Sequence, residues 1–314
     1  MRTKIFVLIA ALALAFVACN DSVVAPTEND ELILKSAEIA ENDMMAESVV
    51  DEIDFEVSFF ADAERLLRQL ANYKGSKNLM HGNMGMRYKG ENNPNVSIEI
   101  GEQEYPITIT IDYGDSTTLK NGRVISGLVS IEVSAPRTTD GATRTITYSN
   151  CVIDSVQIDG VTVETFNTDG ETNRVVTIST NATLVLADGT ELTYTGNRVR
   201  NWLVGFDTPM EHSDDKIEIT GSVSIESSNG NVWAREIIEP LIKVSDCRHP
   251  VQGVVQFTQN GTIIATLNYG NGECDNLAIL TVDGEDVEIE LQGRKPEAKV
   301  EKYRERANNK RGGK

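Results

Sequence analysis

The chain has 314 residues, of which 40% are hydrophobic and 25% charged, and its formal net charge is −19. This length is enough for one large β domain or for two smaller ones, each with its own core. So acidic a chain argues against a nucleic-acid partner, because phosphate binding requires a basic face.

The N-terminus has the layout of a bacterial lipoprotein signal peptide. Arg2 and Lys4 supply positive charge, residues 5–17 form an unbroken apolar run, and Cys19 follows a small residue. A membrane-spanning helix needs ~20 apolar residues, so this shorter run is interpreted as a signal that is removed with residues 1–18. We expect Cys19 to carry palmitate or related acyl chains and to anchor the mature protein in the cell envelope, at the outer membrane.

A tether and a helical segment are expected next. Residues 19–35 contain Pro26 and several polar residues, which is typical of a tether. Residues 36–75 are expected to form an acidic amphipathic helix, since residues 20–72 contain 14 acidic and 3 basic residues. Its apolar positions recur at three, four or seven residues: Val49, Ile53, Val57, Phe60, Leu67 and Leu70. An acidic polar face disfavours a helix lying on a membrane, so the apolar stripe is expected to dock on the β region.

Residues 96–293 are expected to form a mainly β, antiparallel, hairpin-rich sheet or sandwich. Short runs rich in Ile, Val, Thr and Tyr alternate with polar residues. Asn-Gly and Asp-Gly pairs favour tight antiparallel turns, because both residues tolerate positive φ. Several of the expected strands are joined by such pairs: Asp159-Gly160, Asp188-Gly189, Asn229-Gly230, Asn260-Gly261 and Asp283-Gly284. No helix-length pattern interrupts the region, which excludes a parallel βαβ sheet.

One short pattern occurs twice, at residues 109–115 and 265–271, as a strand followed by Asp or Asn, Tyr and Gly. It raises the alternative of two halves with a seam near residues 207–215. Acidic residues in and beside the two loops could bind calcium, or could simply cap turns through their own side chains. They are Asp112, Asp115, Glu273 and Asp275.

A disulfide is expected between Cys247 and Cys274. The sequence numbers of two residues that pair in an antiparallel hairpin add up to a constant. The numbers of the two cysteines have the same sum as those of Asn260 and Gly261, which are expected to form the turn. They should therefore face each other just beyond the hairpin, at a separation near the one a disulfide needs. Cys151 begins an apolar run and is expected to be a buried free thiol.

No motif for catalysis, metal or cofactor is recognisable. The three histidines do not share a helical metal-binding spacing, and no nucleophile elbow, Walker loop or Rossmann fingerprint occurs. Arg198, Arg200 and Trp202 could form a sugar-binding platform, but a strand that buries its Trp while the arginines pair with acids explains them better. Trp233 is expected in the core. The polar tail at residues 294–314 carries 9 basic and 3 acidic residues, and is either solvated or in contact with anionic lipid.

The acidic helix, residues 109–115, residues 198–205 and above all residues 247–291 together resemble a group of uncharacterised, β-rich envelope lipoproteins from Bacteroidota. That group has no assigned activity, so the resemblance implies the anchor and the β architecture and adds no catalytic residue. Bacteria of this phylum O-glycosylate Asp-Ser/Thr sequences in envelope proteins, which makes Ser22 and Ser116 candidate sites. Asp154-Ser155-Val156 also fits, but Ser155 is expected in a strand.

The sequence thus favours a membrane-anchored, non-enzymatic binding or structural module with no cofactor or metal. Its expected partners are the lipid bilayer and a glycan or envelope protein. One alternative is a glycan-active hydrolase, which a convergent carboxylate pair in a cleft would indicate. The other is a periplasmic carrier of an apolar ligand, which an apolar concave face would indicate.

Overall fold

The computed structural model is mainly β, with one long N-terminal helix, so the expected antiparallel fold class is confirmed. The structure describes residues 28–62, 88–89, 93–119, 121–168, 174–206, 208, 213–245, 247 and 249–291. The signal peptide, the start of the tether and the basic tail lie outside these residues.

The helix α1 spans Glu28–Asp62. The strands are β1 (Tyr88–Lys89), β2 (Asn95–Ile100), β3 (Ile107–Asp112), β4 (Thr117–Leu119), β5 (Val124–Val133), β6 (Thr143–Ile153), β7 (Val156–Thr168), β8 (Arg174–Val185), β9 (Glu191–Val204), β10 (Lys216–Ser227), β11 (Val232–Val244), β12 (Gln252–Gln259), β13 (Thr262–Asn271), β14 (Leu277–Val282) and β15 (Glu285–Glu290).

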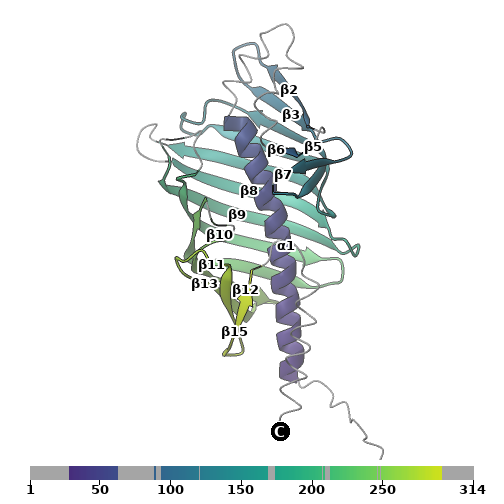
Figure 1. Cartoon of the computed structure of the whole chain (residues 1–314), viewed down its shortest axis with the longest axis vertical. Helices are drawn as coiled ribbons and strands as arrows, with labels where there is room; N and C mark the ends of the chain where they lie inside the picture. Colours follow the sequence, from purple (N-terminus) through teal and green to yellow (C-terminus); the bar gives the residue numbers. More distant parts are fainter. Residues whose placement is uncertain are drawn as a thin grey trace, which may run out of the picture.

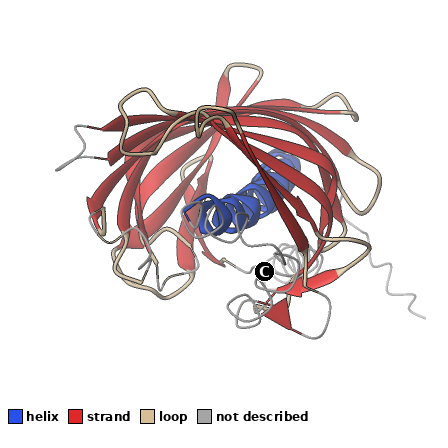
Figure 2. Ribbon diagram, turned by 90° about the horizontal axis from the view of Figure 1, so that it is seen from above, coloured by secondary structure: helices blue, strands red, loops and turns tan. Residues whose placement is uncertain are grey.

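All described strands belong to one antiparallel sheet rather than to two packed sheets. From β4 to β15 each strand pairs with the next one in sequence. The strand β3 pairs with β5, as β4 does, and with β2 on its other side. The sheet is strongly curved, and α1 lies in its hollow, running across the strands (Figures 1 and 2). The molecule is therefore an open trough of strands that holds a central helix.

Bulges account for part of this curvature, because an extra residue in one strand bends it and increases its twist. One bulge displaces the β5–β6 register between Ser126 and Leu128, and another displaces β6–β7 between Tyr148 and Cys151. Gly127 has φ +90°, and a Cβ there would lie 2.1 Å from the carbonyl oxygen of Asn150. Only glycine allows the two backbones to approach this closely.

The helix begins earlier than the sequence analysis predicts. It starts at Glu28, so the second half of the expected tether is helical. No glycine or proline occurs from Thr27 to Lys74, and the segment is rich in Ala, Glu, Leu and Met, which favour helices. The helix ends at Asp62 as described, and Leu67, Leu70 and the expected end at residue 75 lie outside the described residues.

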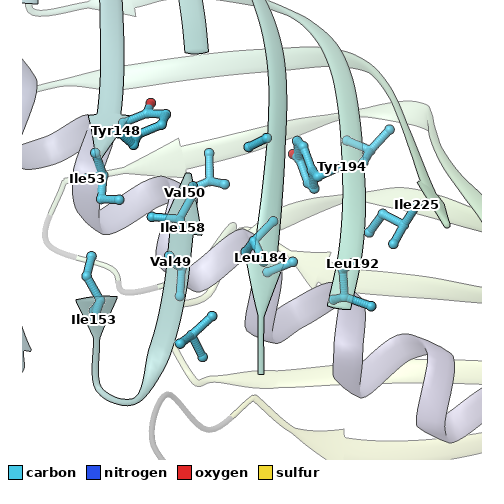
Figure 3. Close-up of a cluster of buried hydrophobic side chains, with 14 of the residues drawn as sticks. Val49, Val50, Ile53, Tyr148, Ile153, Ile158, Leu184, Leu192, Tyr194 and Ile225 are labelled. Atoms are coloured by element: carbon cyan, nitrogen blue, oxygen red, sulfur yellow. The ribbon is translucent and has the colours of Figure 1, made fainter. Parts of the chain in front are cut away.

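The apolar stripe of α1 docks on the sheet, as expected. Val49, Ile53, Val57 and Phe60 are all at most 1% exposed. Figure 3 shows Val49, Val50 and Ile53 beside inward-facing side chains of the sheet: Ile153, Ile158, Leu184, Leu192 and Ile225. Burying such aliphatic side chains contributes about 1.5–3 kcal/mol each, so this contact is a large part of what holds the helix in place.

Four of the five expected Gly turns connect strands, but Asp159-Gly160 does not. It lies inside β7, and the β6–β7 turn is made by Asp154 and Ser155, both with positive φ. Asp159 instead accepts a hydrogen bond from the backbone N–H of Asn150, in the bulge of the neighbouring strand. Gly160 sits where a Cβ would meet the β8 backbone. The dipeptide therefore serves a close approach between strands.

The expected seam near residues 207–215 falls between β9 and β10, which pair directly along most of their length. The sheet is thus continuous on both sides of it. The repeated sequence pattern does correspond to a repeated local structure. Asp112 accepts a hydrogen bond from the N–H of Gly114, and Asn268 accepts the equivalent bond from Gly270.

Within the residues that the structure describes, no helix is both long and apolar enough to cross a bilayer.

Candidate functional site in the concave face

The concave face of the sheet carries a set of cations that meet the acidic residues of α1. Along β6, β9 and β11 the inward positions include arginines where apolar residues would be usual. The cations that pair with helix acids are Arg123, Arg198, Arg200, Arg235 and Lys243, and their helix partners are Asp43, Glu47, Asp51, Glu52 and Asp54. Arg144 of β6 joins this set through Glu164 of β7. Below, this set is called the concave charge cluster.

Glu47 is at the centre of the concave charge cluster. Its carboxylate pairs with Arg198, accepts a hydrogen bond from the Tyr194 hydroxyl at 2.7 Å, and lies 2.9 Å from Nη2 of Arg235. Gly196 makes room here, because a Cβ at that position would lie 2.9 Å from the Tyr194 ring. Two strands, β9 and β11, are thereby tied to one side chain of α1.

Two helical turns beyond Glu47, Asp54 pairs with Arg200. Arg200 also approaches Glu164 of β7 at 4.0 Å, and Glu164 pairs with Arg144 of β6 at 3.1 Å. Asp54, Glu164 and Arg144 are each at most 5% exposed. Breaking one pair of this kind would leave an uncompensated buried charge, which is strongly destabilising.

Arg123, which precedes β5, joins three parts of the chain. Its guanidinium contacts Asp154 in the β6–β7 turn at 2.8 Å, Glu52 of α1 at 3.2 Å and the backbone carbonyl of Ser48 at 2.9 Å. Asp154 also accepts a hydrogen bond from the N–H of Val124. The helix is therefore bound from a second side as well as from the sheet beneath it.

Buried hydroxyl groups of the hollow also form hydrogen bonds. The hydroxyl of Tyr148 donates to Thr162 at 2.9 Å, and Thr162 and Thr180 share a hydrogen bond across β7 and β8. On another side of the helix, Glu56 accepts hydrogen bonds from the hydroxyls of Tyr88 and Tyr113. These buried hydroxyl groups are thus satisfied by neighbouring side chains.

Burial and charge shift the pKa values of the acids in opposite directions. Burial raises the pKa of Asp43 to about 7, although Arg235 opposes the rise. Burial also acts to raise the pKa of Asp51, but the charges of Lys243 and Arg198 outweigh it and hold this pKa well below its usual range. Burial raises the pKa of the Cys151 thiol to about 12, so Cys151 is held as the unreactive thiol.

Arg198 and Arg200 belong to the concave charge cluster, and Trp202 is half-buried, so the segment does not form an open sugar platform. Arg198 and Arg200 point to the helix acids. The ring of Trp202 is covered by Arg174, whose guanidinium carbon lies 3.6 Å from the ring centroid, a distance at which cation–π attraction is strong. Trp233 is 2% exposed and belongs to the core, as expected.

The expected lipidation site Cys19 and the candidate glycosylation site Ser22 lie outside the described residues. Ser116 is exposed in the connection between β3 and β4. Ser155 is also exposed, in the β6–β7 turn with φ +82°. The expectation that Ser155 lies in a strand is therefore wrong, because the turn falls five residues before the Asp-Gly pair expected to make it.

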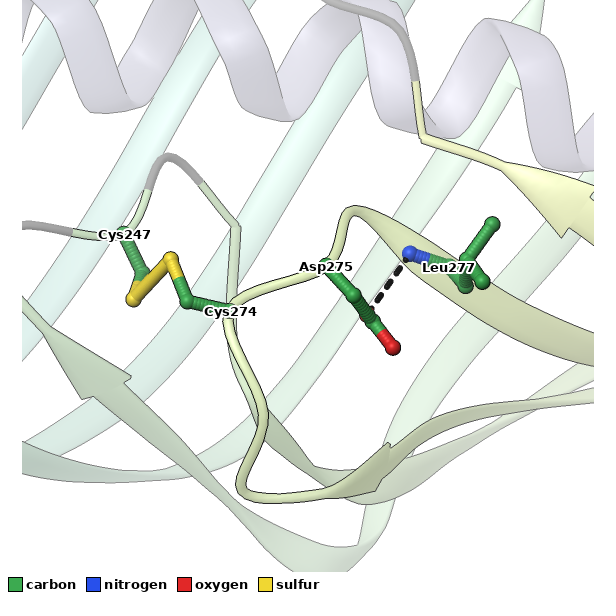
Figure 4. The surroundings of a disulfide bond; sticks show 4 residues. All are labelled: Cys247, Cys274, Asp275 and Leu277. Atoms are coloured by element: carbon green, nitrogen blue, oxygen red, sulfur yellow. Dashed lines mark hydrogen bonds between the residues drawn. A yellow bond between two sulfur atoms is a disulfide. The ribbon is translucent and has the colours of Figure 1, made fainter.

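The structure joins Cys247 to Cys274 in a disulfide, with a Cα–Cα distance of 5.6 Å (Figure 4). The hairpin does not keep one register over its length, however. Gln259 pairs with Thr262 near the turn, whereas Gln252 pairs with Asn271 after two bulges. The two cysteines meet beyond the paired part of the strands, where the chain has left the ladder. Cys151 is a buried free cysteine, as expected.

The acidic loops act as turn caps. Asp275 accepts a hydrogen bond from the N–H of Leu277 at 3.0 Å, and Asp112 caps the Gly114 turn in the same way. Among the described residues, no group of three or more His, Cys, Asp and Glu side chains is arranged to hold a metal ion.

The concave charge cluster is the main feature that the sequence analysis misses. A signal for it is present: inward strand positions at residues 144, 198, 200 and 235 carry Arg, while Asp43, Glu47, Asp51 and Asp54 recur at three- and four-residue spacing on α1. Charges at core positions of two elements indicate that they pair, because unpaired buried charges are costly. The partners themselves depend on how the strands wrap the helix.

Comparison of the chain with protein-family models, with curated proteins and with solved structures finds no match.

Proposed function

We propose that the protein is a lipid-anchored module of the bacterial cell envelope that binds or braces a partner and carries out no reaction. The observation that supports this most is the filled hollow of the sheet. A curved sheet would enclose a ligand or substrate on its concave face, and here that face is occupied by α1 through apolar contacts and ion pairs. The convex face and the sheet edges remain for partners.

The anchor rests on the sequence. The basic start, the apolar run and Cys19 suit a lipoprotein signal, and the resemblance to Bacteroidota envelope lipoproteins agrees with an outer-membrane location. In the mature chain only eight residues separate Cys19 from the first residue of α1. A lipid at Cys19 would therefore hold the helix, and the sheet wrapped on it, close to the membrane. Ser22 and Ser116 are proposed as glycosylation sites on the same basis.

Fractionation of the full chain tests the anchor. We expect the native protein to pellet with membranes, to be released by detergent, and to show an acylated N-terminal Cys19 by intact-mass analysis. Cys19→Ala should move to the soluble fraction. Detergent-sensitive pelleting of Cys19→Ala would show that the anchor lies elsewhere.

Turnover of a polysaccharide by the purified protein, abolished by one Asp or Glu substitution, would contradict the absence of a reaction.

A carrier of an apolar ligand is the second candidate, because the hollow under α1 is lined by large aliphatic side chains. Such a carrier must release α1 to load. A fluorescent fatty acid distinguishes the two functions. The module should show no saturable binding, whereas a carrier should bind it, and more tightly when Glu47→Lys weakens the hold of β9 and β11 on the helix.

A further inference from the structure

The convex face of the sheet has an uncharged centre. On each of the five strands β6 to β10, three outward-facing positions lie in register with those of the neighbouring strands. The residues are Thr143, Thr145, Thr147, Val161, Val163, Thr165, Thr177, Ser179, Asn181, Thr195, Asn197, Val199, Thr220, Ser222 and Ser224. This set is called the uncharged face. All fifteen are exposed or half-exposed, and none is charged, in a chain in which 25% of residues are.

The polar groups of the uncharged face are available to a partner. Of its described side chains, Thr177 alone makes a side-chain hydrogen bond, which it receives from Asn167 at 3.2 Å. The remaining hydroxyls and the two Asn amides face solvent as both donors and acceptors. The Thr and Val methyl groups add apolar contact between them. The surface thus offers alternating hydrogen-bonding and methyl groups over several strands.

Acidic residues border the uncharged face. Glu132 lies opposite Thr145 on β5, and Glu236 lies opposite Ser222 on β11. Asp159, Glu218 and Glu226 extend the outward rows at their ends. The acidic border repels anionic lipid, nucleic acid and acidic polysaccharides.

The composition of the uncharged face disfavours a protein partner. The residues that supply most of the binding energy at protein interfaces are enriched in Trp, Tyr and Arg, and none of these occurs among the fifteen residues. A second copy of this chain, meeting the same face, fails on the same ground.

We propose that the uncharged face binds an uncharged, polyhydroxylated polymer, a neutral glycan. Sugar hydroxyls complement the free Thr, Ser and Asn groups, and the C–H faces of the sugars complement the Thr and Val methyls. Each contact is weak because no aromatic ring stacks on the sugar. Affinity comes from many such contacts along one polymer and from many anchored copies. This proposal rests on the binding role given above and specifies its partner.

Native electrophoresis of the full mature chain in gels containing mannan, dextran or β-1,3-glucan tests the proposal, with mobility expressed relative to a gel without polysaccharide. We expect retardation by at least one of the three and no retardation by anionic polygalacturonate. The double variant with Asn181→Asp and Asn197→Asp should bind at least threefold more weakly, because two charges then occupy the uncharged face. Gln256→Glu is the matched control: the same amide-to-acid change on β12, outside that face, should leave binding unchanged.

Circular dichroism establishes that each variant is folded. The proposal is overturned if none of the three neutral polysaccharides retards the folded wild type, or if the double variant binds as tightly as the wild type. It is likewise overturned if polygalacturonate retards the wild type more than the neutral polysaccharides do, or if sedimentation shows a dimer that the double variant abolishes. Membrane fractionation in the same preparations is independent of these outcomes, so loss of glycan binding leaves the anchored module intact.

Discussion

At the scale of single residues, Asp43 is the group whose ionisation works against folding. It is 2% exposed, one of its carboxylate oxygens has no hydrogen-bond partner, and Arg235 approaches the other only at 3.5 Å. With its pKa raised to about 7 by burial, the folded state binds a proton that the unfolded state has lost. The stability from this group is therefore complete below pH ~4 and is lost as pH rises through 7.

We expect Asp43→Asn to flatten the dependence of stability on pH between 4 and 7. Asn cannot ionise, so the variant should gain on the wild type by about 2–4 kcal/mol across that interval. Urea denaturation at a series of pH values measures the difference. Asp51 acts in the opposite sense, since its pKa is lowered: its stabilisation is present at neutral pH and is lost as pH falls below ~4. Parallel pH curves for wild type and Asp43→Asn would contradict the assignment.

Arg200 should matter far more than its single positive charge suggests. Arg200→Met leaves Asp54, which is 5% exposed, without its main cation. We expect a loss of about 3–5 kcal/mol in the free energy of unfolding. The double variant with Asp54→Asn should recover part of it, because no charge is then left buried. The exposed Lys216→Met on β10 is the control and should change stability by less than ~0.5 kcal/mol. Equal effects of Arg200→Met and Lys216→Met would refute the role of the pair.

At the scale of elements, the strands and most turns follow from local sequence, whereas the course of α1 through the sheet does not. The alternation of apolar and polar residues locates the strands. Asn260-Gly261 and Asp283-Gly284 form turns, and all four residues have the positive φ that such turns require. Asp159-Gly160 shows the limit of this rule, since its glycine serves a close contact with β8. That contact is set by a neighbouring strand that a local pattern does not contain.

The helix shows the same limit. Its apolar stripe predicts one buried face, yet Asp54 and Glu52, which lie on other sides of α1, have side chains that are only 6% and 11% exposed. Burial on several sides requires a sheet that bends around the helix. That bend depends on bulges and on Gly127, whose role becomes visible only with the facing Asn150 carbonyl. The acids of α1 are therefore easily mistaken for a solvated face.

Ile53 provides the test of how firmly α1 is packed. Its side chain is fully buried among the aliphatic residues of the sheet. Ile53→Ala removes that packing and leaves a cavity, so we expect a loss of about 2–5 kcal/mol. Lys35→Ala, at an exposed position of the same helix, should remain within about 0.5 kcal/mol of the wild type. Chemical denaturation measures the stability of both variants. A small effect of Ile53→Ala would mean that the helix is only loosely held.

At the scale of the whole molecule, the sheet is held together differently in its middle and at its C-terminal end. In its middle, β6, β7, β9 and β11 carry residues of the concave charge cluster, and each neighbouring pair of strands from β6 to β10 is joined by a long ladder. Towards the end, β13 and β14 pair over only three residues, Thr266–Asn268 with Ile279–Thr281. The disulfide lies at this thinner end, between the β11–β12 connection and the segment that precedes β14. It ties together two connections that the ladder leaves unpaired.

Reduction of the disulfide should therefore destabilise the C-terminal strands first. The bond closes a loop with a sequence separation of 27 residues, for which the chain-entropy model gives roughly 3 kcal/mol. We expect Cys247→Ser and Cys274→Ser to lower stability equally, and their combination to be no worse than either alone, because each removes the same bond.

Hydrogen exchange in the reduced protein should speed up in β13 to β15 and stay slow in β7 to β9. In that part of the sheet β8 is flanked by a ladder of twelve paired residues on one side and of eleven on the other. Cys151 gives the internal control: buried and with its thiol pKa raised to about 12, it should resist alkylation in both the oxidised and the reduced protein. Uniform acceleration of exchange across all strands would show that the disulfide supports the sheet as a whole and not its C-terminal end.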